Sequence, residues 1–213
     1  MNKRKVVYVT IEDISSGLFL SQVLEPLKRI AETDSQREFN LFVLNSPWKY
    51  LKHRKILKII RNSFLSQKNI SIKYIPLLPP LRNVTRSKLL SKFVTYFIGF
   101  LFFLFIDKKN SLYHSRSYWP CAAGLLINLN PMVFEPRSLW NLENIAMGTI
   151  LKGSSSELYW NNLEKICVDR SEKVISINTQ MANYFTKNYN LYVKNEIIPI
   201  SFSNKNFTFN STV

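Results

Sequence analysis

Short apolar runs suited to strands alternate along the chain with segments that have helical periodicity. Residues 6–10, 39–44 and 70–75 are rich in β-branched and aromatic side chains, the composition typical of strands. Residues 18–31 have the apolar spacing of a helix. Further strands are predicted near Tyr113, Val133, Ile175 and Ile197.

Six or seven strands alternating with helices predict an α/β fold with a Rossmann-like, doubly wound parallel sheet. We expect residues 1–200 to form one domain. Residues 201–213 are polar and lack periodicity, so they are predicted to be a hinge or tail.

Two helical segments have unusual surfaces. Residues 48–65 are strongly basic and carry an apolar stripe, which fits a helix on an anionic membrane surface or an ordinary amphipathic helix packed on the sheet. The stripe consists of Trp48, Leu51, Ile59, Ile60 and Phe64. Residues 93–106 are the most apolar run but fall short of the roughly 20 residues of a membrane span. They predict a buried or interfacial helix that packs between the sheet and a second surface, which could be a lipid membrane.

The charge balance adds a constraint on partners. The 213 residues include 29 Lys and Arg against 14 Asp and Glu, a net charge of +15. Such a field attracts polyanions or anionic membranes. No nucleic-acid-binding signature accompanies the basic residues, so no nucleic-acid partner is predicted. The two cysteines and two histidines have no metal-binding or disulfide pattern.

Two polar clusters follow the predicted strands near Tyr113 and Val133. The first, residues 114–117, is predicted to open a short helix, and the second is residues 135–138. Ligands of open parallel sheets bind beyond the carboxyl ends of the strands, and arginine suits phosphate or carboxylate. Arg116 and Arg137 therefore indicate an anionic ligand. The alternative is that both arginines are solvated or pair with Glu135 and Glu143.

Other local signals concern turns and helix ends. Ser16 and Gly17 stand where the first helix begins, a position suited to an anion, although Gly17 fits a simple turn equally well. Residues 141–156 are predicted to be a functional or mobile loop before a helix over residues 157–169. Thr179 is the predicted N-cap of a later helix.

Several blocks resemble the N-terminal half of family 4 glycosyltransferases, the retaining enzymes with two facing Rossmann-like domains (GT-B fold). They are SSGLFLSQV at residues 15–23, LYHSRSYWPCAAGLL at 112–126, VFEPRSLWNLEN at 133–144, WNNLEKICVDRSEKVISINTQMANYF at 160–185 and EIIPISFS at 196–203. The chain departs from the family at Glu135, where relatives often have aspartate, and at Pro136.

The resemblance implies a role for each matching position. Ser16 and Gly17 would bind the diphosphate of a sugar nucleotide, which would be the donor substrate, with no other cofactor. His114 or Arg116 would face the sugar as catalytic residues. The acceptor side would be lined by Arg137, Ser138 and Glu143.

The resemblance also implies partners and a location. The family's donor-binding half has no counterpart here, so activity would require a donor-domain chain or segment. A glycan or lipid-linked acceptor and an anionic membrane at the cytoplasmic face are the expected partners, with residues 48–61 as the predicted membrane-binding helix. The alternative function is a non-enzymatic basic module that binds anionic membranes or polyanions.

Overall fold

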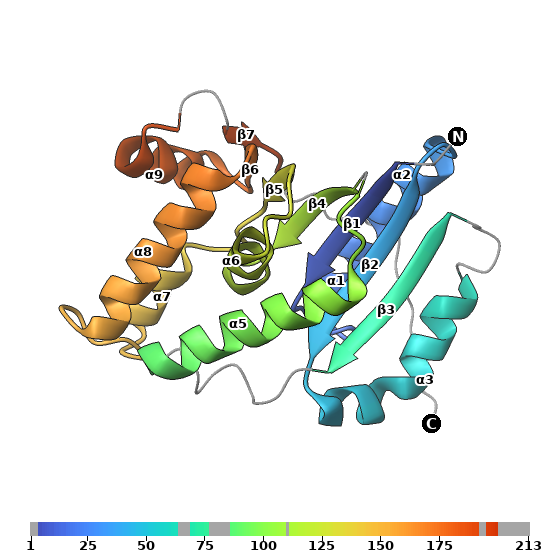
Figure 1. Cartoon of the computed structure of the whole chain (residues 1–213), viewed down its shortest axis with the longest axis horizontal. Coiled ribbons are helices and arrows are strands. Elements are labelled where there is room, and N and C mark those ends of the chain that lie inside the picture. The colour runs from blue at the N-terminus through green and yellow to red at the C-terminus, as the bar shows by residue number, and fades with distance from the viewer. Residues whose placement is uncertain (1–3, 64–68, 77–85, 110, 192–194, 200–213) are drawn as a thin grey trace.

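The predicted parallel sheet is present. The computed structural model describes residues 4–63, 69–76, 86–109, 111–191 and 195–199, and these contain seven strands in the order β3-β2-β1-β4-β5-β6-β7, all parallel (Figure 1). The strands are β1 (Lys5–Thr10), β2 (Glu38–Asn45), β3 (Ile70–Pro76), β4 (Ser111–Arg116), β5 (Met132–Phe134), β6 (Lys173–Ser176) and β7 (Asn195–Ile197). The predicted tail, residues 201–213, lies outside the described residues.

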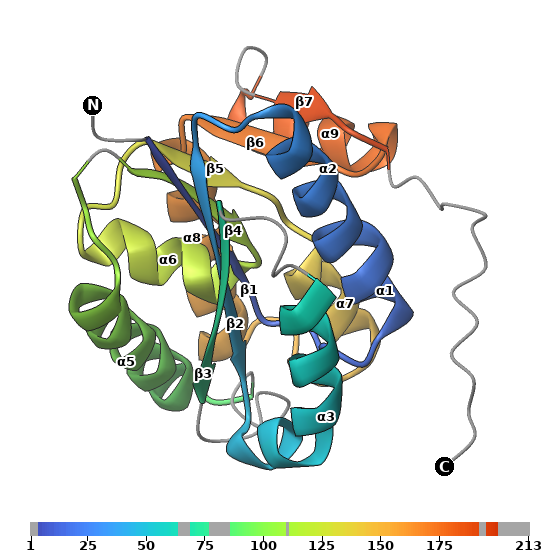
Figure 2. The ribbon, with the colours of Figure 1, turned by 90° about the vertical axis from the view of Figure 1, so that its right-hand side faces the viewer.

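Helices cover both faces of the sheet (Figure 2). They are α1 (Gly17–Phe19), the π-helix η1 (Leu20–Leu24), α2 (Glu25–Thr33), α3 (Pro47–Ser63), α5 (Lys88–Phe105), α6 (Tyr118–Leu126), α7 (Trp140–Ala146), α8 (Ser155–Arg170) and α9 (Thr179–Tyr189). The α1–η1–α2 run and α3 lie on one face, and α5, α6 and α8 lie on the other.

Alternation along the strands creates a separate core on each face, because successive strand side chains point in opposite directions. In β1, Val7 and Val9 join the core beneath α5 and α6, whereas Tyr8 joins the core beneath α2 and α3. The neighbouring strand follows the same rule, with Phe42 in the first core and Leu41 in the second. The apolar strand runs are therefore explained by burial on both faces.

Three local predictions were wrong. His114 and Arg116 belong to strand β4 rather than to a helix, which begins at Tyr118. Residues 141–156 are not simply a loop, because they include most of α7, anchored by Trp140 against Trp119 and Trp160 with ring centroids 6.3 and 6.2 Å apart. The N-cap of α9 is Asn178, whose side chain accepts a hydrogen bond from the backbone N of Met181 at 2.8 Å.

The two unusual helices also differ from their predicted form. In α3, Ile60 is buried with Leu57 against the sheet, so the predicted single stripe is split; Trp48 and Ile59 remain exposed, and Phe64 lies outside the described residues. Helix α5 begins at Lys88, capped by Ser87, and its 18 residues make it long and apolar enough to cross a membrane by length and composition alone.

We predict that Gly124→Ala destabilises the domain. A Cβ atom at Gly124 would lie 2.8 Å from both the Met132 methyl group and the buried Tyr113 ring. The resulting overpacking should cost about 1–3 kcal/mol of unfolding free energy, against a gain in helix propensity of about 1 kcal/mol. Urea denaturation measures the difference.

Gly17→Ala is the matched control, because a Cβ atom there has no neighbour within 4 Å. Its unfolding free energy should stay within about 0.5 kcal/mol of the wild type. If Gly124→Ala were equally neutral, the close packing of α6 on β4 and β5 would be refuted.

Candidate functional site

The candidate site lies where the order of the strands reverses. The chain moves outward from β1 to β2 and β3, then returns to β4 on the other side of β1. Such a switch point is the usual ligand site of an open α/β sheet. Glu12 follows β1, Arg116 ends β4 and Glu135 follows β5, so their side chains meet at this edge.

Arg116 is the centre of this cluster. Its side chain is only 2% exposed and lies between two carboxylates: Nε is 2.6 Å from Glu12 Oε1, and Nη1 is 3.0 Å from Glu135 Oε1. The same guanidinium donates hydrogen bonds to the backbone oxygen and to Oε1 of Gln22, at 2.8 and 2.6 Å. Arg116 therefore connects β1, β4 and β5 to the helical run over the sheet.

The charges in the cluster shift one another's ionisation. Burial alone would raise the pKa of Glu135, but the hydrogen bond and charge of His114, together with the charge of Arg116, hold that pKa below its ordinary value. Burial opposes the charged form of Arg116, yet Tyr8, Glu135 and Glu12 raise the Arg116 pKa. Both groups are therefore charged at neutral pH.

His114 and Tyr8 complete the cluster on one side. His114 Nε2 lies 2.9 Å from Glu135 Oε2, and the Tyr8 hydroxyl donates to the same oxygen at 3.2 Å. The two rings also pack together, with centroids 4.4 Å apart. The hydrogen bond and the ring contact together fix the orientation of the His114 imidazole, which remains partly exposed.

Arg137 lies on the other side of the cluster. Its Nη1 pairs with Glu12 Oε1, and its side chain is one quarter exposed. Glu12 Oε2 and Arg137 Nε are buried without a hydrogen-bond partner among the described residues. An unmade hydrogen bond of this kind is costly, so a small movement of Arg137 would offer both an acceptor and a donor to water or to a ligand.

Ser16 and Gly17 lie at the start of the first helical run. The Ser16 hydroxyl caps this run by accepting from the backbone N of Phe19 at 3.0 Å, as the N-cap role requires. Gly17 is exposed, and open space lies where its side chain would be. This short turn is therefore accessible from outside the domain.

Ser138 and Glu143 stand apart from the charged cluster. The Ser138 backbone oxygen accepts from the hydroxyl of buried Tyr118 at 3.0 Å. Glu143 is exposed on α7, and no ion pair joins it to Arg116 or Arg137 in the described parts of the chain. The sequence suggested that the arginines could pair with Glu135 and Glu143. Arg116 does pair with Glu135, whereas neither Arg116 nor Arg137 pairs with Glu143 within the ranges that the structure describes.

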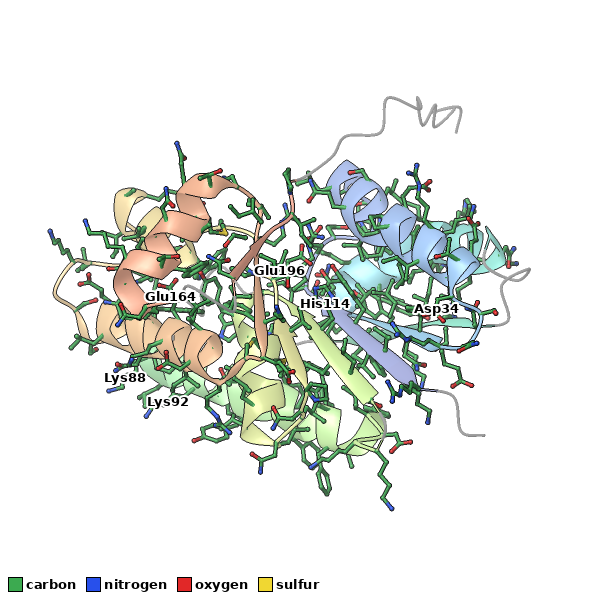
Figure 3. All side chains as sticks on the ribbon, turned by 90° about the horizontal axis from the view of Figure 1, so that it is seen from above. Asp34, Lys88, Lys92, His114, Glu164 and Glu196 are labelled. Atoms are coloured by element: carbon green, nitrogen blue, oxygen red, sulfur yellow. The ribbon has the colours of Figure 1, made fainter. Side chains whose placement is uncertain are left out.

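A cavity of about 750 Å³ adjoins the cluster on the sheet face that carries α2. His114, Arg116 and Glu135 line one part of it, and Ile177 and Ile198 line another. Figure 3 shows His114 near the middle of the molecule, between Glu196 of β7 and the helix α2. Among the described residues, no three His, Cys, Asp or Glu side chains are grouped to hold a metal ion.

Three contributors are not identified by the sequence pattern. Glu12 and Gln22 lie 104 and 94 positions before Arg116. The parallel pairing of β1 with β4 brings Glu12 to Arg116, and the position of η1 over the sheet brings Gln22. Tyr8 looks like an ordinary strand residue. Ser117, between β4 and α6, has φ 132° and ψ 163°, a strained conformation of the kind that clusters at functional sites.

The fold is similar to one half of the GT-B fold of solved glycosyltransferase structures. The chain is similar to sucrose-phosphate synthase from Thermosynechococcus elongatus, with 10% identity and a TM-score of 0.57 over 92% of this chain and 48% of that one. It is also similar to Anabaena HepE, solved with UDP and glucose, with 11% identity and a TM-score of 0.50 over 94% of this chain and 45% of that one.

A third similar structure is the N-terminal domain of Candida albicans trehalose-6-phosphate phosphatase, at 11% identity and a TM-score of 0.50 over 95% of this chain and 49% of that one. The chain thus spans about half the length of the solved structures it matches. No protein-family model matches the sequence, and no curated protein matches it significantly.

We predict that Arg116→Met strongly destabilises the domain. The substitution leaves Glu12 and Glu135 facing each other without a cation, and breaking a buried pair typically costs about 3–5 kcal/mol. Arg137→Met, at a partly exposed position, should cost about 1 kcal/mol or less. Chemical denaturation of both variants makes the comparison, and equal costs would contradict a central role for Arg116.

We also predict a loss of stability in acid. Burial alone would raise the pKa of Asp13, but hydrogen bonds from Lys49 and Ser15 lower it to about 2 from an ordinary 3.8, and the pKa of Glu135 is lowered as well. The unfolded chain therefore binds more protons in this range, so this stabilisation is full above about pH 4 and falls toward pH 2.

Asp13→Asn tests this pH dependence. The variant should be about 1–2 kcal/mol less stable than the wild type at pH 6, and the gap should narrow as the pH approaches 2. Denaturation curves across this range measure it. A gap that stays constant with pH would show that the Asp13 carboxylate is not the cause.

Proposed function

We propose that this chain is the acceptor-side half of a retaining, sugar-nucleotide-dependent glycosyltransferase that acts on a polysaccharide or lipid-linked glycan. The observation that carries the proposal is the charged cluster around Arg116 at the switch point of a half GT-B fold, beside an open cavity. Similarity in fold to sucrose-phosphate synthase and HepE supports the glycosyltransferase class.

Each part of the edge suits a different portion of the substrates. The accessible turn at Ser16 and Gly17 would present the backbone N–H of Gly17 to a diphosphate, whereas the N–H of Ser16 donates to the backbone oxygen of Asp13 at 2.9 Å. Arg137 and Glu12, which have unused hydrogen-bonding atoms, suit an acceptor hydroxyl, which both donates and accepts. Ser138 and Glu143 would extend this acceptor side along the chain that follows.

The roles of His114 and Arg116 differ in this proposal. His114 is partly exposed toward the cavity and is oriented by Glu135, so it can reach a sugar hydroxyl. Arg116 is enclosed by its partners and acts as a positioning residue for Glu12, Glu135 and the Gln22 turn. Its positive charge still favours an anionic donor at this edge.

A donor-binding domain would complete the site, supplied by the same polypeptide or by a partner chain. Transfer requires the anomeric carbon of the sugar nucleotide to be held against the acceptor oxygen. Such positioning can lower the activation barrier by up to about 7–11 kcal/mol. The cluster around Arg116 lies at one edge of the sheet and cannot enclose both substrates alone.

We predict that the 213-residue chain alone does not transfer sugar, and that turnover appears when a donor domain of a structurally similar enzyme is added. The measurement is product formation from a panel of UDP-, GDP- and dTDP-linked sugars, with calorimetry of each nucleotide on the isolated chain. Micromolar binding or turnover by the chain alone would contradict the half-site proposal.

Variants in the complemented mixture separate chemistry from folding. Arg137→Ala should lower kcat/KM about tenfold to a hundredfold with little loss of stability, because its side chain is partly exposed. Gly17→Ala should raise KM for the sugar nucleotide. Saturable binding of RNA or heparin at physiological salt, with no turnover in any mixture, would instead favour the basic-module alternative.

A further inference from the structure

Helix α5 presents a continuous apolar face to the outside of the domain. Four aromatic residues on this face remain mostly exposed: Phe93 by 61%, Tyr96 by 64%, Phe100 by 57% and Phe103 by 62%. Leu89, exposed by 78%, extends the same face toward the start of the helix. At 3.6 residues per turn these five positions lie within an arc of roughly 80° and over about 21 Å of helix.

The opposite face of α5 is fully committed to the domain. Val94, Ile98 and Phe102 are buried in the core, and Gly99 faces the backbone of α6, where a Cβ atom would make an ordinary contact with the Ala123 oxygen at 3.5 Å. A helix that crossed a bilayer would have to abandon these contacts. The arrangement therefore suits a helix that stays in the domain and lies parallel to a surface.

The charged residues of α5 are all lysines, and Asp107, which follows the helix, pairs with Lys5 at 2.8 Å. Lys88 and Lys92 project from its first turns, away from the body of the molecule (Figure 3). At the other end, Lys108 Nζ lies 5.2 Å from the centroid of the Phe103 ring. The helix itself contains no Asp or Glu. Aromatic side chains between lysines match the interface of an anionic bilayer, where rings enter the headgroup layer and ammonium groups meet phosphates.

We propose that α5 docks this domain onto an anionic lipid bilayer, with Phe93, Tyr96, Phe100 and Phe103 in the headgroup and upper acyl region. This inference rests on the exposed face alone and does not depend on the proposed catalytic role. It assigns lipid binding to α5 rather than to α3. On α3, Lys55 falls inside the arc formed by exposed Trp48, Leu51 and Ile59, so that surface is interrupted by charge.

Vesicle flotation with the full chain tests the assignment. The probes are vesicles of phosphatidylcholine alone and of phosphatidylcholine mixed with phosphatidylglycerol. We expect binding to the mixed vesicles to be at least about tenfold stronger, and to fall in about 1 M salt, where the Debye length is about 3 Å. Equal binding to both vesicles, or to neither, would overturn the proposal.

Two matched triple variants locate the docking surface. Phe93→Ser, Phe100→Ser and Phe103→Ser together should lower the partition coefficient by at least about tenfold. The control, Trp48→Ser, Leu51→Ser and Ile59→Ser on α3, should change it less than about threefold. All six side chains are exposed, and unchanged circular-dichroism melting would verify folding. The reverse ranking of the two variants would overturn the assignment to α5.

The exposed face of α5 could instead bind a second copy of this chain, and sedimentation velocity tests for such a dimer. The proposal predicts that the wild-type protein stays monomeric without lipid. A dimer that the α5 variant abolishes, without vesicle binding by the wild type, would overturn it in favour of self-association.

Discussion

The burial of Arg116 between Glu12 and Glu135 is the interaction on which the sheet edge depends. A guanidinium that is 2% exposed loses most of its hydration, and only close carboxylates and hydrogen-bond acceptors compensate. Glu12 comes from the end of β1, Glu135 from the end of β5, and Gln22 from the helical run above the sheet. One side chain of β4 thus joins the first strand and the first helical run of the chain to the end of β5.

This constraint determines what the site can offer. Because Arg116 is enclosed by its partners, the groups that can meet a ligand are at its margins: His114 toward the cavity, Arg137 on the other side, and the open turn at Gly17. The cluster is therefore oriented but incomplete. In the proposed function, a donor-binding domain would lie opposite these groups.

The fold could be predicted from the sequence because β1 and β2 contain continuous apolar runs, and such runs between helical segments imply a covered parallel sheet. The location of the cluster could also be predicted, since strand ends share one edge. Glu135 could be predicted as a partner of Arg116, but Glu12 and Gln22 could not, because Glu12 joins Arg116 only through strand pairing and Gln22 only through the helical run over the sheet. Helix α7 escaped prediction because packing of Trp140 with Trp119 and Trp160, rather than periodicity, holds that segment in place.

The most direct test of this account is a double-mutant cycle between Arg116 and Glu135. Unfolding free energies of the wild type, Arg116→Met, Glu135→Gln and the double variant give the coupling between the two side chains. If the sheet edge depends on this pair, the double variant is less destabilised than the sum of the single variants, with a coupling of about 1.5–3 kcal/mol. A coupling below about 0.5 kcal/mol would show that the sheet edge does not depend on this pair.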